Sequence, residues 1–205
     1  MKKLIIAFLL SIGTFTAFSQ QKGSFELGVN VGYNGATVSN GTQTNSSSRN
    51  GLNLGISGDY FFSDRWSIKS KLTYDQKGWD RGYIQDLNGQ SYTTDYRLDY
   101  ITIPVMANWH FGKKRNWYLH FGPYLGFLMS AKDTRFNIDL KSMFQSVDAG
   151  LDLGIGVKIP VSQKTKLFFE LDGQSGFADI NAQYQANKFL NSRSSINIGF
   201  VFDLK

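Results

Sequence analysis

The chain has 205 residues, a formal net charge of +6 and no cysteine. This length is enough for one domain and not comfortably for two. The lack of cysteine excludes a disulfide framework and a lipid anchor attached to a cysteine. The positive charges are scattered, with one cluster at 113–115 in a predicted turn, so the charge predicts no nucleic-acid partner.

The first twenty residues have the layout of an export signal. Lys2 and Lys3 precede an apolar run, and the small residues Ala17 and Ser19 follow it. A membrane anchor is the alternative, but the apolar run is short for a spanning helix. We therefore expect a signal peptide over 1–19 and a mature domain over 20–205.

Aromatic residues and glycine are abundant in the rest of the chain, and proline is scarce. No window after the signal is apolar enough for a transmembrane helix. Such an exported chain is either a soluble β-domain or a barrel whose lipid-facing residues occupy every second position.

The first half of the mature chain contains four segments in which apolar and polar residues alternate. In the first, Phe25, Leu27 and Val29 share one face, and Glu26 and Asn30 take the other. Period-two alternation predicts β-strands. These segments cover 25–34, 52–62, 66–75 and 101–111.

The second half repeats the pattern at 117–127, 148–159, 167–174 and 196–204. Most segments are ten to thirteen residues long, whereas soluble strands commonly have about five or six and tilted membrane strands need about nine to eleven. The chain ends within its last aromatic-rich segment, which suits recognition by the barrel assembly machinery of the outer membrane.

The connections alternate strictly between short and long. The short ones are 63–64, 112–116 and 160–165, and the long polar ones are 39–50, 79–97, 130–147 and 179–192. Outer-membrane barrels have short periplasmic turns and longer outer loops. We therefore predict an all-β fold, a monomeric eight-stranded antiparallel up-and-down transmembrane β-barrel in outer-membrane lipid, with both termini on the periplasmic side. A soluble lipocalin-like barrel is the alternative fold.

The polar face of the strands carries charges that the barrel would enclose. An eight-stranded barrel is only about wide enough for its side chains, and buried charges must be paired or hydrated. We expect a salt-bridged plug, with a narrow ion path as the alternative. The predicted lumen charges are Glu26, Asp59, Lys69, Lys71, Asp75, Asp152, Lys158, Glu170 and Asp172.

The long connection 79–97 is the predicted contact surface. Its aromatic and charged residues suit a protein or glycan partner in the envelope, whereas 39–50 is rich in Ser, Thr and Asn and suggests flexibility. The contact residues are Trp79, Arg81, Tyr83, Tyr92 and Tyr96.

Residues suited to catalysis are few. A lipid-modifying barrel enzyme would need a histidine paired with a serine and oriented by a third polar group. Only His110 and His120 are available, and both flank a short turn, at the periplasmic rim. No metal-ligand spacing emerges, and the glycines Gly150, Gly154 and Gly156 lie within a strand rather than in a phosphate loop. We predict no catalytic residue, metal or cofactor.

The segments also resemble the PorT-like outer-membrane β-barrel family, common in Bacteroidota, along essentially the whole mature chain. The resemblance rests on 100–104 (Tyr-Ile-Thr-Ile-Pro), 122–126 (Gly-Pro-Tyr-Leu-Gly), the Asp and Gly pattern of 148–156, Glu170 with 176–180, and the Asn, Gly and Phe of 197–202. The family often carries an arginine two residues after this glutamate; here the position is Asp172, which argues against an inherited pairing in the lumen.

Some members of the family take part in protein secretion across the outer membrane and in gliding, so the resemblance implies a secretion role. From these observations we expect a structural or partner-binding protein. A narrow channel or small-solute transport barrel is the first alternative, and a lipid-modifying barrel enzyme is the second.

Overall fold

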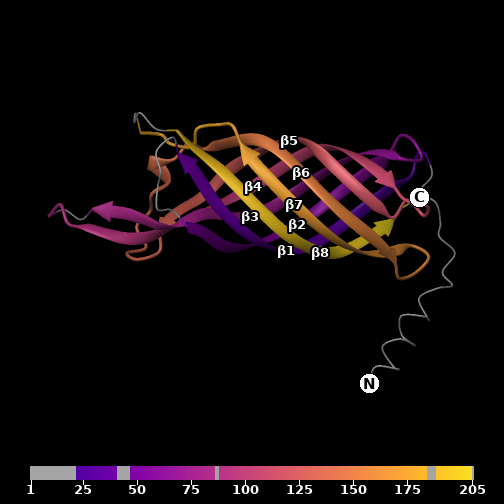
Figure 1. Ribbon diagram of the computed structural model, residues 1–205, viewed down its shortest axis with the longest axis horizontal. Helices are drawn as coiled ribbons and strands as arrows, with labels where there is room; N and C mark the ends of the chain where they lie inside the picture. Colours follow the sequence, from indigo (N-terminus) through magenta and orange to yellow (C-terminus); the bar gives the residue numbers. More distant parts are fainter. Residues whose placement is uncertain (1–21, 41–46, 86–87, 184–187, 205) are drawn as a thin grey trace, which may run out of the picture.

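The structure, a computed structural model, describes residues 22–40, 47–85, 88–183 and 188–204. The expected signal peptide over 1–19 lies outside the described residues. In this part of the chain eight antiparallel strands form one closed ring, each hydrogen-bonded to its neighbours in chain order (Figure 1). The predicted eight-stranded up-and-down barrel is therefore confirmed.

The strands differ in length, and the longest are β3 and β4. The elements are β1 (Phe25–Asn40), β2 (Ser47–Phe61), β3 (Trp66–Gln85), β4 (Ser91–Phe111), β5 (Trp117–Asp133), the short 3-10 helix η2 (Lys141–Met143), β6 (Val147–Pro160), β7 (Thr165–Gly176) and β8 (Phe189–Asp203).

The register of the pairs defines the tilt of the strands. Paired residues traced round the ring from Phe25 lead through β2 to β8 and return to β1 at Gly35, ten positions further along. A displacement of this kind requires strands inclined by about 35–45° to the barrel axis. Tilted strands of this length are able to cross a bilayer.

The two faces of the barrel wall have opposite polarity. Outward side chains such as Leu54 and Leu153 are more than half exposed, at 58% and 59%, while inward ones such as Glu170 and Asp152 are buried. A lipocalin-like barrel would bury its apolar face, so the direction of the side chains favours a membrane wall. Within the described residues, no helix is long and apolar enough to cross a membrane.

Short turns and aromatic side chains mark one end of the barrel. The rings of Trp66 and Trp109 lie 6.4 Å apart, and Phe111 stacks near Trp109 at 5.0 Å and Trp117 at 6.4 Å. Aromatic residues in such a position anchor a barrel at headgroup level. Because outer-membrane barrels place their short turns in the periplasm, we take this end as the periplasmic one.

The other end departs from the expectation of long loops. Most of 79–97, predicted to be a loop, is a β-hairpin formed by the extended ends of β3 and β4, which projects beyond the neighbouring strands (Figure 1). The ends of β1, β2, β5 and β8 likewise run into the predicted loops. Backbone pairing continues here because each strand still finds a neighbour.

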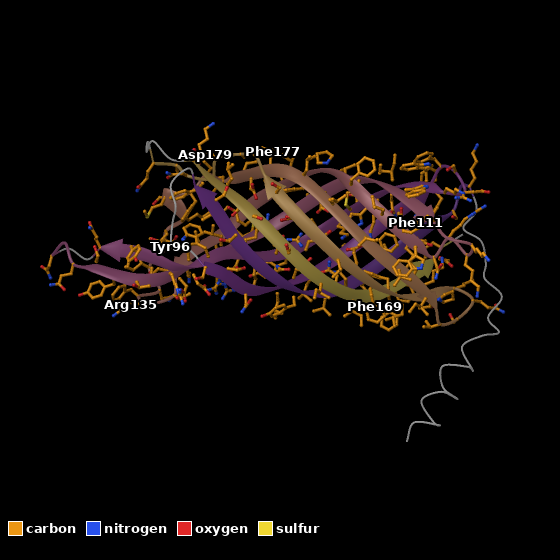
Figure 2. All side chains as sticks on the ribbon, viewed as in Figure 1. Tyr96, Phe111, Arg135, Phe169, Phe177 and Asp179 are labelled. Atoms are coloured by element: carbon orange, nitrogen blue, oxygen red, sulfur yellow. The ribbon has the colours of Figure 1, made fainter. Side chains whose placement is uncertain are left out.

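An apolar cluster, called the outer cap below, closes the barrel beyond the charged interior. Trp79 stacks on Tyr96 with ring centroids 4.6 Å apart, and Phe144 meets both rings edge-on. Figure 2 shows this projecting end, where Tyr96 and Arg135 lie, far along the barrel from Phe111. The buried members of the outer cap are Val38, Trp79, Tyr96, Leu98, Tyr100, Leu128, Ala131, Leu140, Phe144 and Ile180.

Candidate functional site: the charged barrel interior

Six of the eight strands supply charged side chains to the interior of the membrane-spanning length. Period-two alternation directs them all inward, and each is buried. The set is Glu26 from β1, Asp59 from β2, Lys69, Lys71, Asp75 and Lys77 from β3, Asp148, Asp152 and Lys158 from β6, Lys166, Glu170 and Asp172 from β7, and Arg193 from β8. We call this set the interior charge network.

Glu170 lies at the centre of the network. Its two carboxylate oxygens accept hydrogen bonds from Lys69 Nζ at 2.7 Å and Lys71 Nζ at 2.5 Å. The Tyr118 hydroxyl donates a further bond at 2.8 Å, and the Asn197 amide another at 3.3 Å. Four donors satisfy one carboxylate, which is what a buried charge needs to be tolerated.

Arg193 connects this centre to the opposite wall of the barrel. Its guanidinium contacts Asp172 at 2.7 Å and Asp75 at 3.2 Å. Asp172 also lies 3.4 Å from Lys71, and Asp75 accepts a bond from the Asn34 amide at 2.7 Å. Position 172, where the PorT-like family often carries an arginine, is therefore an aspartate that pairs with cations from β8 and β3.

The periplasmic part of the network is arranged around Glu26. Its carboxylate accepts hydrogen bonds from Lys158 and from Lys166, the latter at 2.6 Å. Lys158 also contacts Asp59 at 3.2 Å, and Lys166 contacts Asp203 at 2.7 Å. These pairs link five strands across the mouth of the barrel.

The outer part consists of Lys77 and Asp148. Their charged groups lie 3.1 Å apart, and the Asp148 carboxylate also accepts bonds from the Tyr124 hydroxyl at 3.1 Å and the Asn191 amide at 3.0 Å. The Lys77 ammonium lies over the ring of Tyr124, 4.6 Å from its centroid. Directly beyond this group, the apolar outer cap begins.

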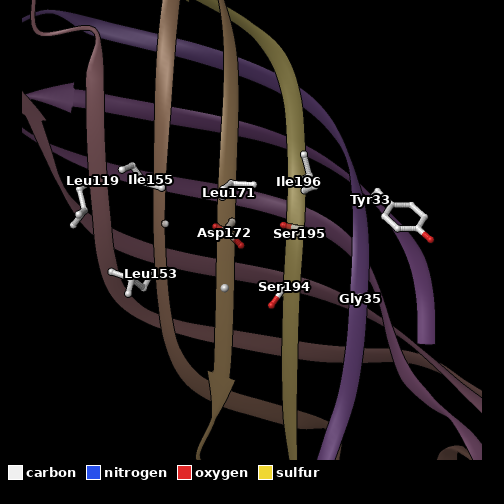
Figure 3. Close-up of a pocket in the computed structure, with 12 residues that line it drawn as sticks. Tyr33, Gly35, Leu119, Leu153, Ile155, Leu171, Asp172, Ser194, Ser195 and Ile196 are labelled. Carbon is white, nitrogen blue, oxygen red and sulfur yellow. The ribbon is translucent and has the colours of Figure 1, made fainter. Parts of the chain in front are cut away.

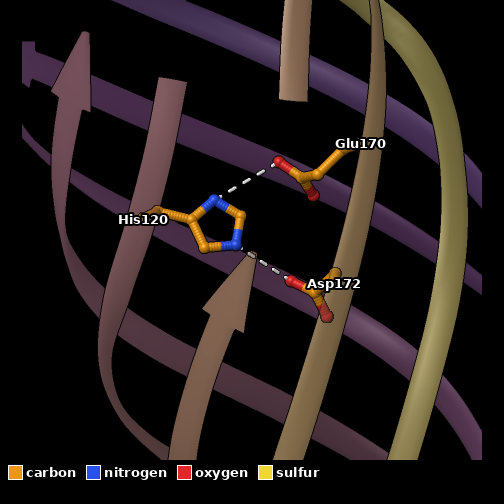
Figure 4. Close-up of side chains that lie close together, drawn as sticks. All are labelled: His120, Glu170 and Asp172. Carbon is orange, nitrogen blue, oxygen red and sulfur yellow. Dashed lines mark hydrogen bonds and ion pairs between the residues drawn. The ribbon is translucent and has the colours of Figure 1, made fainter. Parts of the chain in front are cut away.

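The charges of the network nearly cancel. Among the described interior residues, seven carboxylates face six lysine and arginine cations. His120 lies within 3.5 Å of Glu170 and Asp172 (Figure 4) and also of Asp152. An imidazolium there would make the count equal. Near-neutrality matters because an unpaired buried charge is costly.

One group in the network has the donor types of a metal site. Ligand atoms of His120, Glu170 and Asp172 all lie within 4.8 Å of one another. However, Lys69 and Lys71 already contact Glu170, and Arg193 contacts Asp172. A divalent cation would have to displace these ammonium and guanidinium groups, so we assign the cluster to ion pairing.

All nine lumen charges expected from the sequence lie on the inner face and make polar contacts there. Alternation within the predicted segments did not identify Lys77, Lys166, Arg193 or His120, and Asp148 was not included in the predicted set although it begins the segment 148–159. Lys77, Lys166 and Arg193 lie just outside the strand limits that it assigned, and His120 was placed at the rim. Extending each alternating segment by two to four residues would have included the first three.

Among the described residues, His110 lies near a serine in the manner of a hydrolase. Its Nε2 lies 3.1 Å from Ser67 Oγ, 3.1 Å from the Asn108 amide and 3.9 Å from Asp59. A catalytic triad needs the acid on the second ring nitrogen, whereas here all three groups share Nε2. The side chain is also fully buried, which suits a packing role.

The predicted outer contact residues separate into two groups. Trp79 and Tyr96 are buried in the outer cap, so their placement on a contact surface was wrong: they support the hairpin from within. Tyr83 is 62% exposed and Arg81 is exposed. Tyr92 packs edge-on against Phe136, with the Arg135 guanidinium 4.8 Å from the centroid of its ring.

A hollow of about 650 Å³ lies on the wall formed by β5, β6, β7, β8 and β1 (Figure 3). Gly173, Ser194 and Gly35 are neighbours across three strands, and their small side chains leave the space between Leu171, Ile196 and other outward residues. The exposed apolar lining faces lipid rather than the charged interior.

Residues 18–182 match the protein family described as "Outer membrane protein beta-barrel domain". The fold is similar to the crystal structure of the outer membrane protein OprG from Pseudomonas aeruginosa, at 12% sequence identity and a TM-score of 0.55, covering 91% of this chain and 98% of that one. It is also similar to Neisserial surface protein A, at 18% identity and a TM-score of 0.54, covering 88% and 99%. A search of curated proteins found no matching sequence.

Proposed function

The chain belongs to this family of outer-membrane β-barrels, and from that premise we propose that it is a non-conducting wall protein that presents a contact surface at its outer end. The observation that carries the proposal is the interior charge network, which links opposite walls of the barrel through Glu170 and Arg193. Among the described residues, neither His110 nor the cluster of His120, Glu170 and Asp172 offers a comparable basis for catalysis or transport.

Two consecutive barriers would oppose an ion in the lumen. It would first have to part ion pairs such as those of Lys158 with Glu26 and Asp59, and then pass the buried rings of the outer cap. An eight-stranded barrel leaves little room beside its own side chains. The narrow channel is therefore the weaker function, and His110 gives little support to a lipid-modifying enzyme.

Conductance in planar bilayers tests the seal. We expect no unitary current from the wild-type protein or from Lys69→Ala/Glu170→Ala, because the outer cap still closes the lumen of that variant. Stepwise currents are expected when Lys69→Ala/Glu170→Ala is combined with Trp79→Ala/Phe144→Ala, which opens both barriers. The lipid-facing Leu153→Ala variant is the matched control and should be silent. Currents from the wild-type protein would favour the channel instead.

The contact surface proposed for the outer end comprises Arg81, Tyr83, Tyr92, Arg135 and Phe136. Exposed aromatic and arginine side chains recur at binding hot spots, and Tyr83 and Phe136 are 62% and 47% exposed beyond the membrane-spanning length. An envelope protein or a glycan is the expected partner. The PorT-like resemblance supports a part in secretion.

Photocrosslinking in intact cells tests this surface. A photoreactive residue in place of Tyr83 should yield a discrete adduct with an envelope component, whereas the same residue in place of Leu54, which faces lipid with similar exposure, should yield only lipid adducts. Identical products from the two positions would reject the contact surface and leave a purely structural role.

A further inference from the structure

Exposed cations gather at the periplasmic end of the barrel. Arg65 lies in the turn between β2 and β3, Lys113 and Lys114 in the turn between β4 and β5, and Lys164 in the turn between β6 and β7, while Lys22 precedes β1; all five are exposed. We call these five residues the basic rim.

The carboxylates described at this end are already engaged elsewhere. Asp64 contacts Arg115 at 3.2 Å, Asp203 contacts Lys166 at 2.7 Å, and Glu26 receives Lys158 and Lys166. The basic rim is thus left as an excess of positive charge. At the outer end, by contrast, cations and carboxylates are mixed, as in the Arg49–Asp80 and Arg97–Asp99 pairs.

The short turns keep these charges close to the bilayer surface. Arg65 directly precedes Trp66, and Lys113 and Lys114 lie between Phe111 and Trp117. Those aromatic residues mark the headgroup level, and a residue of extended chain covers only about 3.3 Å. The Arg115 guanidinium also bonds the Asp64 carbonyl oxygen at 3.2 Å, which holds two of the turns together.

From this charge and this placement we propose that the basic rim binds anionic phospholipid headgroups of the periplasmic leaflet. Lysine and arginine side chains extend along apolar surface to place their charge among headgroups, and a phosphate diester supplies the complementary anion. A soluble anionic partner fits less well, because turns of this length do not project beyond the headgroup layer.

Lipid retention in nanodiscs made of equal parts phosphatidylglycerol and phosphatidylcholine tests the proposal. The wild-type protein, released into mild detergent and weighed by native mass spectrometry, should retain phosphatidylglycerol in preference to phosphatidylcholine by about fivefold or more, given the attraction of each basic residue to an anionic surface. High salt during release should reduce this preference, because it screens exposed charges.

The decisive comparison is between two variants of equal charge. Replacement of Lys113, Lys114 and Lys164 by Gln should sharply reduce the preference, whereas replacement of Lys132, Lys141 and Lys188 by Gln at the outer end should leave it intact. Heated and unheated gel mobility checks that both barrels fold. If the first variant does not fold, the salt dependence of the wild-type protein decides.

Four outcomes would overturn the proposal. Equal retention of phosphatidylglycerol by the two variants would mean that the basic rim is not the binding site, and equal loss would mean that only net charge matters. A wild-type preference insensitive to salt would rule out the electrostatic contact. Crosslinks from Lys114 to a soluble periplasmic protein, together with no lipid preference, would mean that the basic rim binds that protein instead of lipid.

Discussion

The membrane-spanning part of the barrel and the part beyond it, called the outer length below, are built from the same strands. In the first the inward side chains are mainly polar, and in the second they are mainly apolar. In the first, β4 directs Thr102 and Asn108 inward and Val105 outward; in the second, it directs Leu98 and Tyr96 inward. The interior changes from ion pairs to an apolar cluster within two residues of β3, between Lys77 and Trp79. The solvent around a strand, and not its backbone, decides which face is apolar.

The largest expected effect comes from removing one charge of the central pair. Glu170→Gln removes the one ion-pair partner of the Lys69 ammonium among the described residues and should lower the free energy of unfolding by about 3–5 kcal/mol. Urea unfolding in lipid vesicles, followed by tryptophan fluorescence, measures the change.

The double variant Lys69→Met/Glu170→Gln is the control for this prediction. It removes the charge from both sides, and Lys71 keeps its contact with Asp172 at 3.4 Å. The double variant should therefore be more stable than Glu170→Gln alone, since a neutralised pair costs less than a broken one. Additive losses would show that the charges act independently.

A charge on the outward face should distinguish the two lengths directly. Leu153 and Ile138 are similarly exposed, at 59% and 48%, but Leu153 faces the middle of the bilayer and Ile138 lies in the outer turn. Leu153→Arg should cost about 2–4 kcal/mol, whereas Ile138→Arg should stay within about 0.5 kcal/mol. Equal costs in the same vesicle assay would place both residues in one solvent.

Sequence alternation predicted the strands within the bilayer because one rule holds there without interruption. It failed beyond the bilayer, where the rule inverts and the phase shifts. In β3 the register shifts between Trp79 and Gly82, next to Arg81 with its φ of 61°, so that buried residues are no longer spaced by two. The pairing between β4 and β5 also shifts, between Asp99 and Tyr100. Because the alternation of apolar and polar residues changes phase at both places, the sequence predicted a polar loop there.

Most of the interior charges were predictable from the sequence, but their partners were not. Inward placement follows from parity within one strand, as for Lys69 and Lys71. Contact between Glu170 on β7 and Lys69 on β3 depends on the tilt and the closure of the ring, which bring residues 101 positions apart into contact. The alternation within one strand contains no information about which distant strand lies opposite, and so it could not identify Arg193 as a partner of Asp172.

A smaller effect tests how far the outer cap acts as a separate core. Ile180 is fully buried in it, and its carbonyl oxygen accepts a bond from the Gln145 amide at 2.8 Å. Ile180→Val should cost about 0.5–1.5 kcal/mol, which corresponds to exchange of the Gln145 amide about 2- to 12-fold faster. Hydrogen exchange should stay unchanged at Lys69 and Glu170; faster exchange there would mean that the two lengths open together.

The smallest expected effect concerns the turn after β5, which is held by a carboxylate rather than by apolar contacts. Asp133 accepts hydrogen bonds from the backbone N–H groups of Phe136 and Ile138, both at 2.7 Å. Burial alone would raise the pKa of this carboxyl, but these bonds, with one from the Thr94 hydroxyl, together lower its pKa below the ordinary 3.8. A lowered pKa in the folded protein means that the stabilisation is present above the ordinary aspartate range and is lost as the pH falls through the lowered value.

The amide resonances of Phe136 and Ile138 should accordingly titrate below pH 3.8, and the inflection should vanish in Asp133→Asn. Because the network around Glu170 lies in the other length of the barrel, its resonances should not follow this inflection; a common midpoint would show that the outer turn and the interior charges titrate as one unit.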